Sequence, residues 1–250
     1  MKRVLKIALL LGLLGGIGLA VVAWKYWRVR DYINQWQYDR THEQTAVNSV
    51  KKIQAILAEF ERVSYAKLDP EYLSETLSDQ SPYKGMLSAK RYYLIPEDDI
   101  YRKIVGHYRI KDFLPKDAYY RHHVVSMGES EGLYWLINPK LLYAFLGLQN
   151  ELKAQKYRSD GFVMVNGYRH PAYNKAKGGA SRSRHMLGEA VDILIKDING
   201  DGRNNQADKD IVLKILDEKV IANKGGLGRY PGTMSVHFDV RGRRARWDKQ

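Results

Sequence analysis

The sequence contains no cysteine. That absence excludes disulfide bonds, thiolate metal ligands and a cysteine nucleophile, so a metal ion would have to be bound by His, Asp or Glu. Acidic residues are also scarce beside basic ones, because 28 Asp and Glu stand against 41 Lys and Arg and give a formal net charge of +13. This imbalance suits a polyanionic partner such as nucleic acid, anionic lipid or an anionic polymer.

Charge is missing altogether from Ile7 to Trp24, close to the N-terminus. At about 1.5 Å per residue, a helix over this stretch would be roughly 27 Å long, near the thickness of the hydrocarbon core of a bilayer. Basic residues flank the stretch, and Tyr26 and Trp27 follow it as aromatic boundary residues. We predict an uncleaved membrane anchor over residues 1–30, with a cleaved signal peptide as the alternative.

Residues 31–117 contain no motif with a recognisable mechanism. From Asp31 to about Lys67, apolar residues recur every three or four positions, which predicts an amphipathic helix. Between residues 68 and 117, prolines interrupt tyrosine-rich stretches without a clear period. We therefore expect a mainly helical stalk or accessory region of unknown role.

The C-terminal part alternates helix and strand patterns. Asn138 and Pro139 form a helix start signal, and the apolar spacing that follows predicts a core helix to Lys156. A short buried strand is expected over residues 162–166, and alternating patterns predict two more strands over residues 189–195 and 235–240.

These two alternating strands carry polar residues suited to a metal. Asp192 shares a strand face with apolar neighbours, which is costly for a carboxylate unless it is paired or bound to a cation. His237 and Asp239 project to one side of their own strand because side chains alternate with period two. Together with His185, Asp192 and His237 would make a three-ligand set of the kind found in catalytic zinc sites. Hydrogen-bonded structural roles are the alternative for each residue.

Several separated motifs occur in a fixed order. The first is GYRHPAYN at residues 167–174, and the others are Ser-x-His-x-x-Gly-x-Ala-x-Asp from Ser183 to Asp192 and His-x-Asp at His237 and Asp239. In these segments the chain resembles the zinc D-alanyl-D-alanine carboxypeptidase and murein endopeptidase family, which shares a fold with the hedgehog signalling domain.

The resemblance covers about residues 138–250 and implies an α+β fold with a small antiparallel sheet and packed helices. We predict a zinc peptidase domain at residues 118–250, preceded by a single N-terminal transmembrane helix and the mainly helical region. It further implies that His185, Asp192 and His237 bind catalytic zinc, and that Arg169 points at the substrate carboxylate or at the oxygen that becomes negative during attack.

The expected activity is zinc-assisted hydrolysis of a peptide bond in peptidoglycan stem peptides, by a D-Ala-D-Ala carboxypeptidase or a murein endopeptidase. One branch of the family has a Glu three residues before the second His, but this sequence has Met234 there. Asp239 is then the nearest candidate for the catalytic base, although it fits equally well as a residue that orients a ligand imidazole. The alternative function is a non-catalytic, zinc-containing cell-wall-binding module.

A second metal motif follows the Asp192 strand. Residues 197–208 match a twelve-residue calcium loop, with Gly202 at the sharp turn. The expected ligands are Asp197, Asn199, Asp201, the backbone carbonyl of Arg203, and Asp208. We predict a structural calcium site, and a turn that binds nothing is the alternative.

The predicted partners are peptidoglycan and the membrane that holds the anchor. The C-terminal arginines form a basic patch, but no nucleic-acid fold motif accompanies them, so no nucleic acid is expected. The expected location is the bacterial inner membrane, single-pass, with the peptidase domain on the periplasmic or extracytoplasmic side. The sequence sets no oligomeric state.

Overall fold

The computed structural model describes residues 26–43, 45–126 and 132–248. The predicted membrane segment from Ile7 to Trp24 lies outside these residues. Among the described residues, no helix combines the length and the apolar character needed to cross a bilayer.

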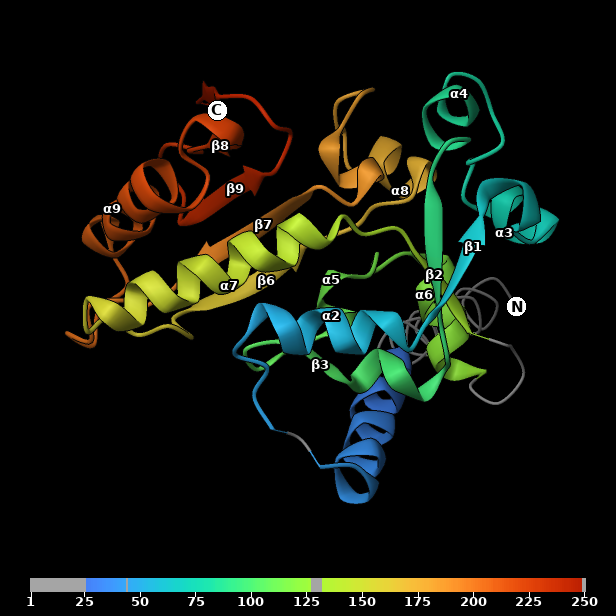
Figure 1. Ribbon diagram of the computed structural model, residues 1–250, viewed down its shortest axis with the longest axis horizontal. Helices are drawn as coiled ribbons and strands as arrows, with labels where there is room; N and C mark the ends of the chain where they lie inside the picture. Colours follow the sequence, from blue (N-terminus) through green and yellow to red (C-terminus); the bar gives the residue numbers. More distant parts are fainter. Residues whose placement is uncertain (1–25, 44, 127–131, 249–250) are drawn as a thin grey trace, which may run out of the picture.

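A five-stranded sheet forms the centre of the C-terminal half (Figure 1). Its strands, in spatial order, are β10 (Ala245–Trp247), β8 (Gly226–Gly228), β9 (Ser235–Asp239), β7 (Ala190–Ile195) and β6 (Phe162–Asn166). Neighbouring strands are antiparallel except for the parallel pair β10 and β8. The predicted α+β class with a small, mainly antiparallel sheet is therefore confirmed.

One face of this sheet is covered by helices. Helix α7 (Pro139–Ala154) begins as predicted at Asn138, whose side chain accepts a hydrogen bond from the backbone N–H of Lys140. Phe145 of α7 packs against Phe162 of β6 and Phe238 of β9, with ring centroids 5.4 and 6.3 Å away. Helix α9 (Gln206–Ile215) lies beside α7 (Figure 1). The opposite face is less covered, and Val163 of β6 is exposed there.

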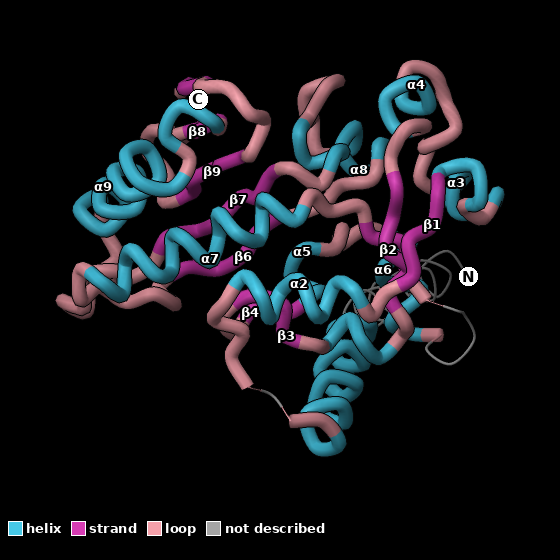
Figure 2. The backbone as a smooth tube through the Cα atoms, in the orientation of Figure 1, coloured by secondary structure: helices cyan, strands magenta, loops and turns pink. Residues whose placement is uncertain are grey.

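The N-terminal half of the described chain mixes helices and strands (Figure 2). Residues 26–41 are helical, followed by α2 (Val50–Ala58). A three-stranded antiparallel sheet has the order β1 (Glu61–Ser64), β2 (Arg91–Ile95) and β5 (Leu133–Trp135), and β3 (Lys103–Val105) pairs with β4 (Tyr108–Arg109). The shorter α-helices are α3 (Pro70–Glu75), α4 (Tyr83–Leu87), α5 (Ile110–Phe113), α6 (Ala118–Val125) and α8 (Pro171–Ala176). The remaining helical turns are η1 (Tyr65–Lys67), η2 (Asp98–Tyr101), η3 (Arg184–Leu187), η4 (Leu216–Val220) and η5 (Ala222–Lys224).

The prediction of one amphipathic helix from Asp31 to about Lys67 is wrong in its extent. The chain leaves the helix after residue 41, and Val47 exchanges two backbone hydrogen bonds with Gly106 before α2 begins. Ser49 then caps α2 by accepting a hydrogen bond from the N–H of Lys52. Pairing with a distant segment thus breaks the helix, and the region is less helical than expected.

The first described helix packs onto the rest of the chain. Asp31 forms an ion pair of 2.8 Å with Lys111 and accepts a hydrogen bond of 3.1 Å from the hydroxyl of Tyr120. Buried apolar residues of the N-terminal and C-terminal halves belong to one core cluster. The described part of residues 31–117 is therefore packed structure, while the division of the chain at residue 117 stays a prediction.

Candidate metal centre

Strand register brings Asp192 and His237 together. Asp192 on β7 is the direct partner of His237 on β9 in the antiparallel ladder. Their sequence neighbours Val191 and Phe238 are fully buried on the helix-covered face, so Asp192 and His237 project from the other face. Cross-strand partners lie about 5 Å apart at Cβ, which places the two side chains in contact.

His185 reaches the same place from a helical turn. It lies in η3, which ends at Gly188 in the left-handed conformation with φ 63°. A Cβ at this glycine would collide with the backbone carbonyl of Leu136, so the motif glycine permits both the turn and its close packing. The chain then enters β7 only a few residues before Asp192.

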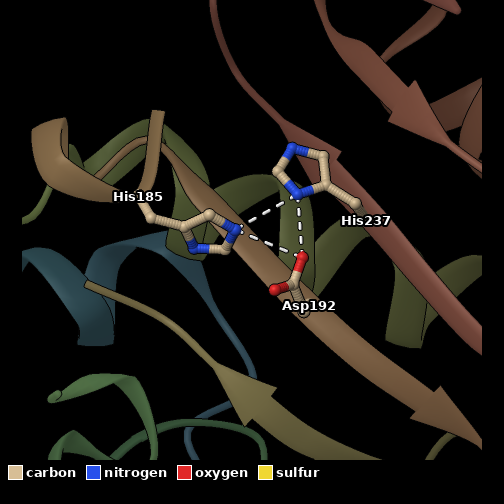
Figure 3. A group of neighbouring side chains, drawn as sticks. All are labelled: His185, Asp192 and His237. Atoms are coloured by element: carbon tan, nitrogen blue, oxygen red, sulfur yellow. Dashed lines mark hydrogen bonds and ion pairs between the residues drawn. The ribbon is translucent and has the colours of Figure 1, made fainter. Parts of the chain in front are cut away.

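Three donor atoms converge at this point (Figure 3). His185 Nε2 lies 3.2 Å from both Asp192 Oδ1 and His237 Nδ1, and His237 Nδ1 lies 2.8 Å from Asp192 Oδ1. All three atoms lie within 4.8 Å of one another, and the residues form the one group of this kind among the described residues. The structure therefore brings together the three predicted zinc ligands.

The outer nitrogen of each imidazole is already engaged. His185 Nδ1 donates to the backbone carbonyl of Gly167 at 2.7 Å, and His237 Nε2 donates to Asp239 Oδ2 at 3.2 Å. These bonds fix the tautomers so that the inner nitrogens carry lone pairs. Two lone pairs and a carboxylate oxygen facing one another repel unless a cation lies between them. This donor set fits zinc, which binds His and Asp side chains at about 2.0 to 2.2 Å.

His185, Asp192 and His237 shift one another's pKa values. Burial would raise the pKa of Asp192, but the two histidines hold it well below its usual value. Burial lowers the pKa of His185. For His237 burial acts in the same direction, yet hydrogen bonds to Asp192 and Asp239 outweigh it and raise the pKa. Of the two histidines, His237 therefore binds a proton more readily.

Asp239 lies behind His237, away from the cleft. Its side chain is fully buried, and it accepts hydrogen bonds from Arg241 Nε at 2.8 Å and from the backbone N–H of Gly226 at 3.1 Å. These bonds and the one to His237 outweigh burial and keep the pKa of Asp239 far below its usual value. A carboxylate so placed is a weak base, and the arrangement favours the second role left open by the sequence, the orientation of His237.

Arg169 lies beside the centre as expected from the motif. Its Nη2 donates to Asp192 Oδ2, and its Nε is buried without a hydrogen-bond partner. The second oxygen of Asp192 also accepts a hydrogen bond of 3.2 Å from the amide of Asn166. Arg169 thus orients the metal-binding carboxylate.

The N-terminal half supports the loop that carries Arg169. The N–H of Tyr168 donates to the carbonyl of Phe113 at 2.7 Å, and His170 Nδ1 lies 2.5 Å from Asp117 Oδ2. Both contacts are made by residues on either side of Arg169. The region whose role was unreadable in the sequence therefore helps to fix the position of this guanidinium.

Asn166, which donates to Asp192, and Tyr230, which lines the cleft, were not predicted from the sequence. A bulge between Met164 and Asn166 shifts the register of β6, so that Asn166 rather than Val165 faces Asp192. Tyr230, in the turn between β8 and β9, lines the cleft next to the ligands. The bulge left no sequence signal.

The cleft above the centre has a volume of about 650 Å³ and is strongly basic. Asp192 is the single acid among the described residues that line it, whereas six cationic side chains do so: Arg169, Lys177, Arg182, Arg184, Arg241 and Arg243. Three of the six, at positions 177, 182 and 243, have no carboxylate partner within the described residues. An anionic ligand fits this cleft.

The predicted calcium ligands do not converge in the same way. Asp208 accepts hydrogen bonds from the backbone N–H groups of Ile198, Asn199 and Asn205, and it caps α9. The remaining side-chain ligands of the motif also accept from backbone N–H groups of the loop: Asp197, Asn199 and Asp201. Calcium binding by this loop stays a prediction.

Comparison with known protein families gives independent support for this metal centre. Residues 138–239 match the family model described as Peptidase M15, and this range contains Arg169 and all three converging ligands. No curated protein and no solved structure matches the chain. The predicted zinc D-alanyl-D-alanine carboxypeptidase family is thereby confirmed for this part of the chain.

Proposed function

We propose that this Peptidase M15 domain is a zinc-dependent hydrolase of peptide bonds in peptidoglycan stem peptides, acting as a carboxypeptidase or an endopeptidase. The observation that supports this most directly is the convergence of His185 Nε2, Asp192 Oδ1 and His237 Nδ1 at the base of an open, basic cleft. Three protein ligands leave a position for water or substrate, which is the arrangement of catalytic rather than structural zinc.

His185, Asp192 and His237 would hold the metal. When bound, zinc supplies a Lewis acid that polarises a carbonyl and makes water acidic enough to attack near neutral pH. The chain's own residues set the geometry, because the carbonyl of Gly167 and the carboxylate of Asp239 keep each imidazole in one tautomer and orientation. Arg169 holds Asp192, and its cationic guanidinium lines the cleft, where it would attract an anionic group of the substrate.

Substrate charge is consistent with this proposal. Peptidoglycan stem peptides carry free carboxylates, and the cationic side chains of the cleft that lack a carboxylate partner would attract them. Bidentate binding by arginine is the geometry best suited to a carboxylate.

A non-catalytic wall-binding module is the second candidate. It is favoured by one observation, namely that no carboxylate other than Asp192 is found among the described residues of the cleft, so no side-chain base for the attacking water is evident there. Such a module would keep zinc and bind peptidoglycan without cleaving it.

The test is digestion of purified peptidoglycan by the full chain in detergent, followed by mass spectrometry of the soluble products. Loss of a terminal alanine identifies a carboxypeptidase, and separation of cross-linked peptides identifies an endopeptidase. Products should vanish after metal removal with a chelator and return with zinc. Stoichiometric zinc and wall binding without any product would support the binding module instead.

We also propose that residues 1–30 anchor the protein in a bacterial inner membrane with the peptidase domain outside the cytoplasm. The proposal rests on the uncharged stretch from Ile7 to Trp24 and on the location of peptidoglycan. Carbonate extraction of membranes and protease digestion of spheroplasts test it. Release by carbonate, or protection of the C-terminal half from added protease, would contradict it.

The third part of the proposal is a structural calcium ion in the loop of residues 197–208. Its support is the motif itself, which has oxygen-bearing residues at the expected positions and Gly202 at the turn.

A further inference from the structure

Tyr230 lines the same cleft as Arg169 and the three predicted zinc ligands. It belongs to the turn of residues 229–234 between β8 and β9, and its ring is half-buried. Burial and the charge of Asp192 raise the pKa of its hydroxyl to about 12, while Arg169 acts in the opposite direction. The phenol therefore lies within electrostatic reach of the metal-binding carboxylate, and it keeps its proton at neutral pH.

The backbone of Tyr230 has a conformation that a tyrosine rarely adopts. Its φ is 34°, in the left-handed region, and the next residue is Pro231. A residue before proline is restricted to extended conformations, so this position is disfavoured for two reasons. Such backbone strain persists only where the surrounding structure enforces it, and it concentrates at functional sites.

A buried lysine enforces this conformation. Lys209 of α9 is 1% exposed, and its Nζ donates to the carbonyl of Tyr230 at 2.9 Å and to that of Thr233 at 2.6 Å. The carbonyl of Tyr230 also accepts from the hydroxyl and the N–H of Thr233, at 3.0 and 3.2 Å. Burying an ammonium group is costly even when two carbonyls accept its hydrogen bonds. This cost is consistent with a functional role for the conformation of the turn.

From this geometry we propose that the Tyr230 hydroxyl donates a hydrogen bond to the carbonyl oxygen of the scissile peptide bond as that oxygen becomes negative, and that Lys209 is the positioning residue for it. The inference rests on the proposed hydrolytic function. Tyr230 transfers no proton in this role, and its contribution is a fixed donor aimed at developing charge.

The composition of the cleft supports this role for a tyrosine. Arg169 already shares its Nη2 with Asp192, and position 234 holds a methionine instead of an acid. No other tyrosine is found among the described residues that line the cleft. Tyr230 therefore supplies a neutral donor in this cleft, which Ser183 and Trp247 also line.

Tyr230→Phe in the full chain is the first test, because it removes one oxygen atom and keeps the ring. The assay uses two substrates, a blocked tripeptide ending in D-Ala-D-Ala and a cross-linked muropeptide dimer. We expect kcat to fall about 100-fold with KM changed less than about threefold, as for loss of one oxyanion donor. Zinc content and Tm should match wild type. Tyr143→Phe, on the helix-covered side of the sheet, is the matched control.

A binding measurement gives a readout besides activity. A phosphinate analogue of D-Ala-D-Ala carries tetrahedral oxygens that resemble the attacked carbonyl, and such analogues report transition-state contacts. We expect Tyr230→Phe to weaken binding of the zinc-loaded protein to this phosphinate at least tenfold by calorimetry. Equal binding and equal kcat in wild type and Tyr230→Phe would overturn the inference while leaving the hydrolytic function intact.

Lys209→Met tests the positioning role. We expect it to lower kcat by at least tenfold, and the double variant Tyr230→Phe/Lys209→Met to be no slower than Tyr230→Phe alone. This non-additivity is the result that a merely structural lysine would not give. Effects that multiply in the double variant would overturn the role of Lys209. A wild-type protein that binds zinc and cleaves neither substrate would overturn both the inference and the function on which it rests.

Discussion

The His185, Asp192 and His237 centre and the loop of residues 197–208 are the two metal sites predicted from the sequence, and their side chains behave differently. In the centre, three donor atoms face one another within 4.8 Å. In the loop, the expected calcium ligands accept hydrogen bonds from backbone N–H groups of the loop itself. The two sites are joined by the chain that leaves β7.

The difference shows what a rigid sheet contributes to a metal site. Asp192 and His237 are cross-strand partners, so the register of β7 and β9 brings them together whether or not a metal is bound. In the loop, an ion has to share the carboxylate oxygens with backbone donors, so its site depends on the ion. The centre is built in advance, whereas the loop is not.

Replacing His185 should have the largest effect on zinc binding and cleavage. His185→Ala removes one of three ligands, so we expect loss of stoichiometric zinc and a fall in peptidoglycan cleavage on the order of 10³-fold or more. His107→Ala, at an exposed histidine, is the control and should retain both. Zinc measured by mass spectrometry after dialysis checks the result. Full zinc content in His185→Ala would show that the metal binds elsewhere.

Asp239→Asn should weaken the centre by a smaller amount. Loss of the carboxylate behind His237 should reduce zinc affinity about 10-fold to 100-fold, as for other residues that orient a ligand. The zinc-saturated variant should keep most of its kcat. Asp217→Asn, which removes a carboxylate paired with Arg244 and Arg246 instead, should leave zinc affinity unchanged. Normal zinc affinity with no activity in Asp239→Asn would favour the base role.

Zinc binding to the centre should depend on pH. The pKa of His237 is raised by its hydrogen bonds to Asp192 and Asp239, while His185 next to it has a lowered pKa. A raised pKa means that His237 keeps a competing proton to a pH above about 6.5, the ordinary value for histidine. Zinc affinity should therefore fall about tenfold per pH unit below the raised pKa, with one proton released on binding.

Calorimetry in buffers of different ionisation enthalpy counts that proton. Asp192 stays ionised through this range because its pKa is held well below the usual value, so it adds no second proton. Zinc affinity that is constant between pH 6 and 8 would contradict the proposed protonation of His237.

Calcium binding to the loop should have the smallest effect on the zinc centre. If the loop binds calcium, saturation to 100 times Kd stabilises the fold by about 2.7 kcal/mol, which is a rise in Tm of roughly 5 to 10 °C. Asp201→Asn should abolish this rise, and Asp210→Asn, outside the loop, should not. Zinc content should be equal in all three proteins. No change in Tm with millimolar calcium would identify the loop as a turn that binds nothing.

Much of the site was predictable because its signals are local. The strands at β6, β7 and β9 and the helix α7 lie where alternation, apolar spacing and the Asn138-Pro139 signal predict them. The three ligands follow from motif and strand period. Their convergence needed the register of β7 against β9, which no local pattern supplies.

The features that were missed depend on contacts between distant segments. Val47 pairs with Gly106, and β1, β2 and β5 pair across long stretches of sequence, so the helix predicted across residues 31–67 does not form as a whole. The position of Asn166 depends on the bulge in β6. The position of Tyr230 depends on a hydrogen bond from the buried Lys209 of α9. Asp239 looked like a base because it shares a strand face with His237, and its burial became evident only from β8 packing against it.

The central claim is that metal in the buried centre drives peptide hydrolysis in the cleft. The most direct measurement titrates zinc into the metal-free full chain and records, in the same samples, the zinc bound and the muropeptides cleaved. We predict that cleavage rises in proportion to occupancy and saturates at one zinc per chain, and that His185→Ala shows neither. Cleavage that is independent of occupancy, or zinc bound to saturation without cleavage, would contradict the account.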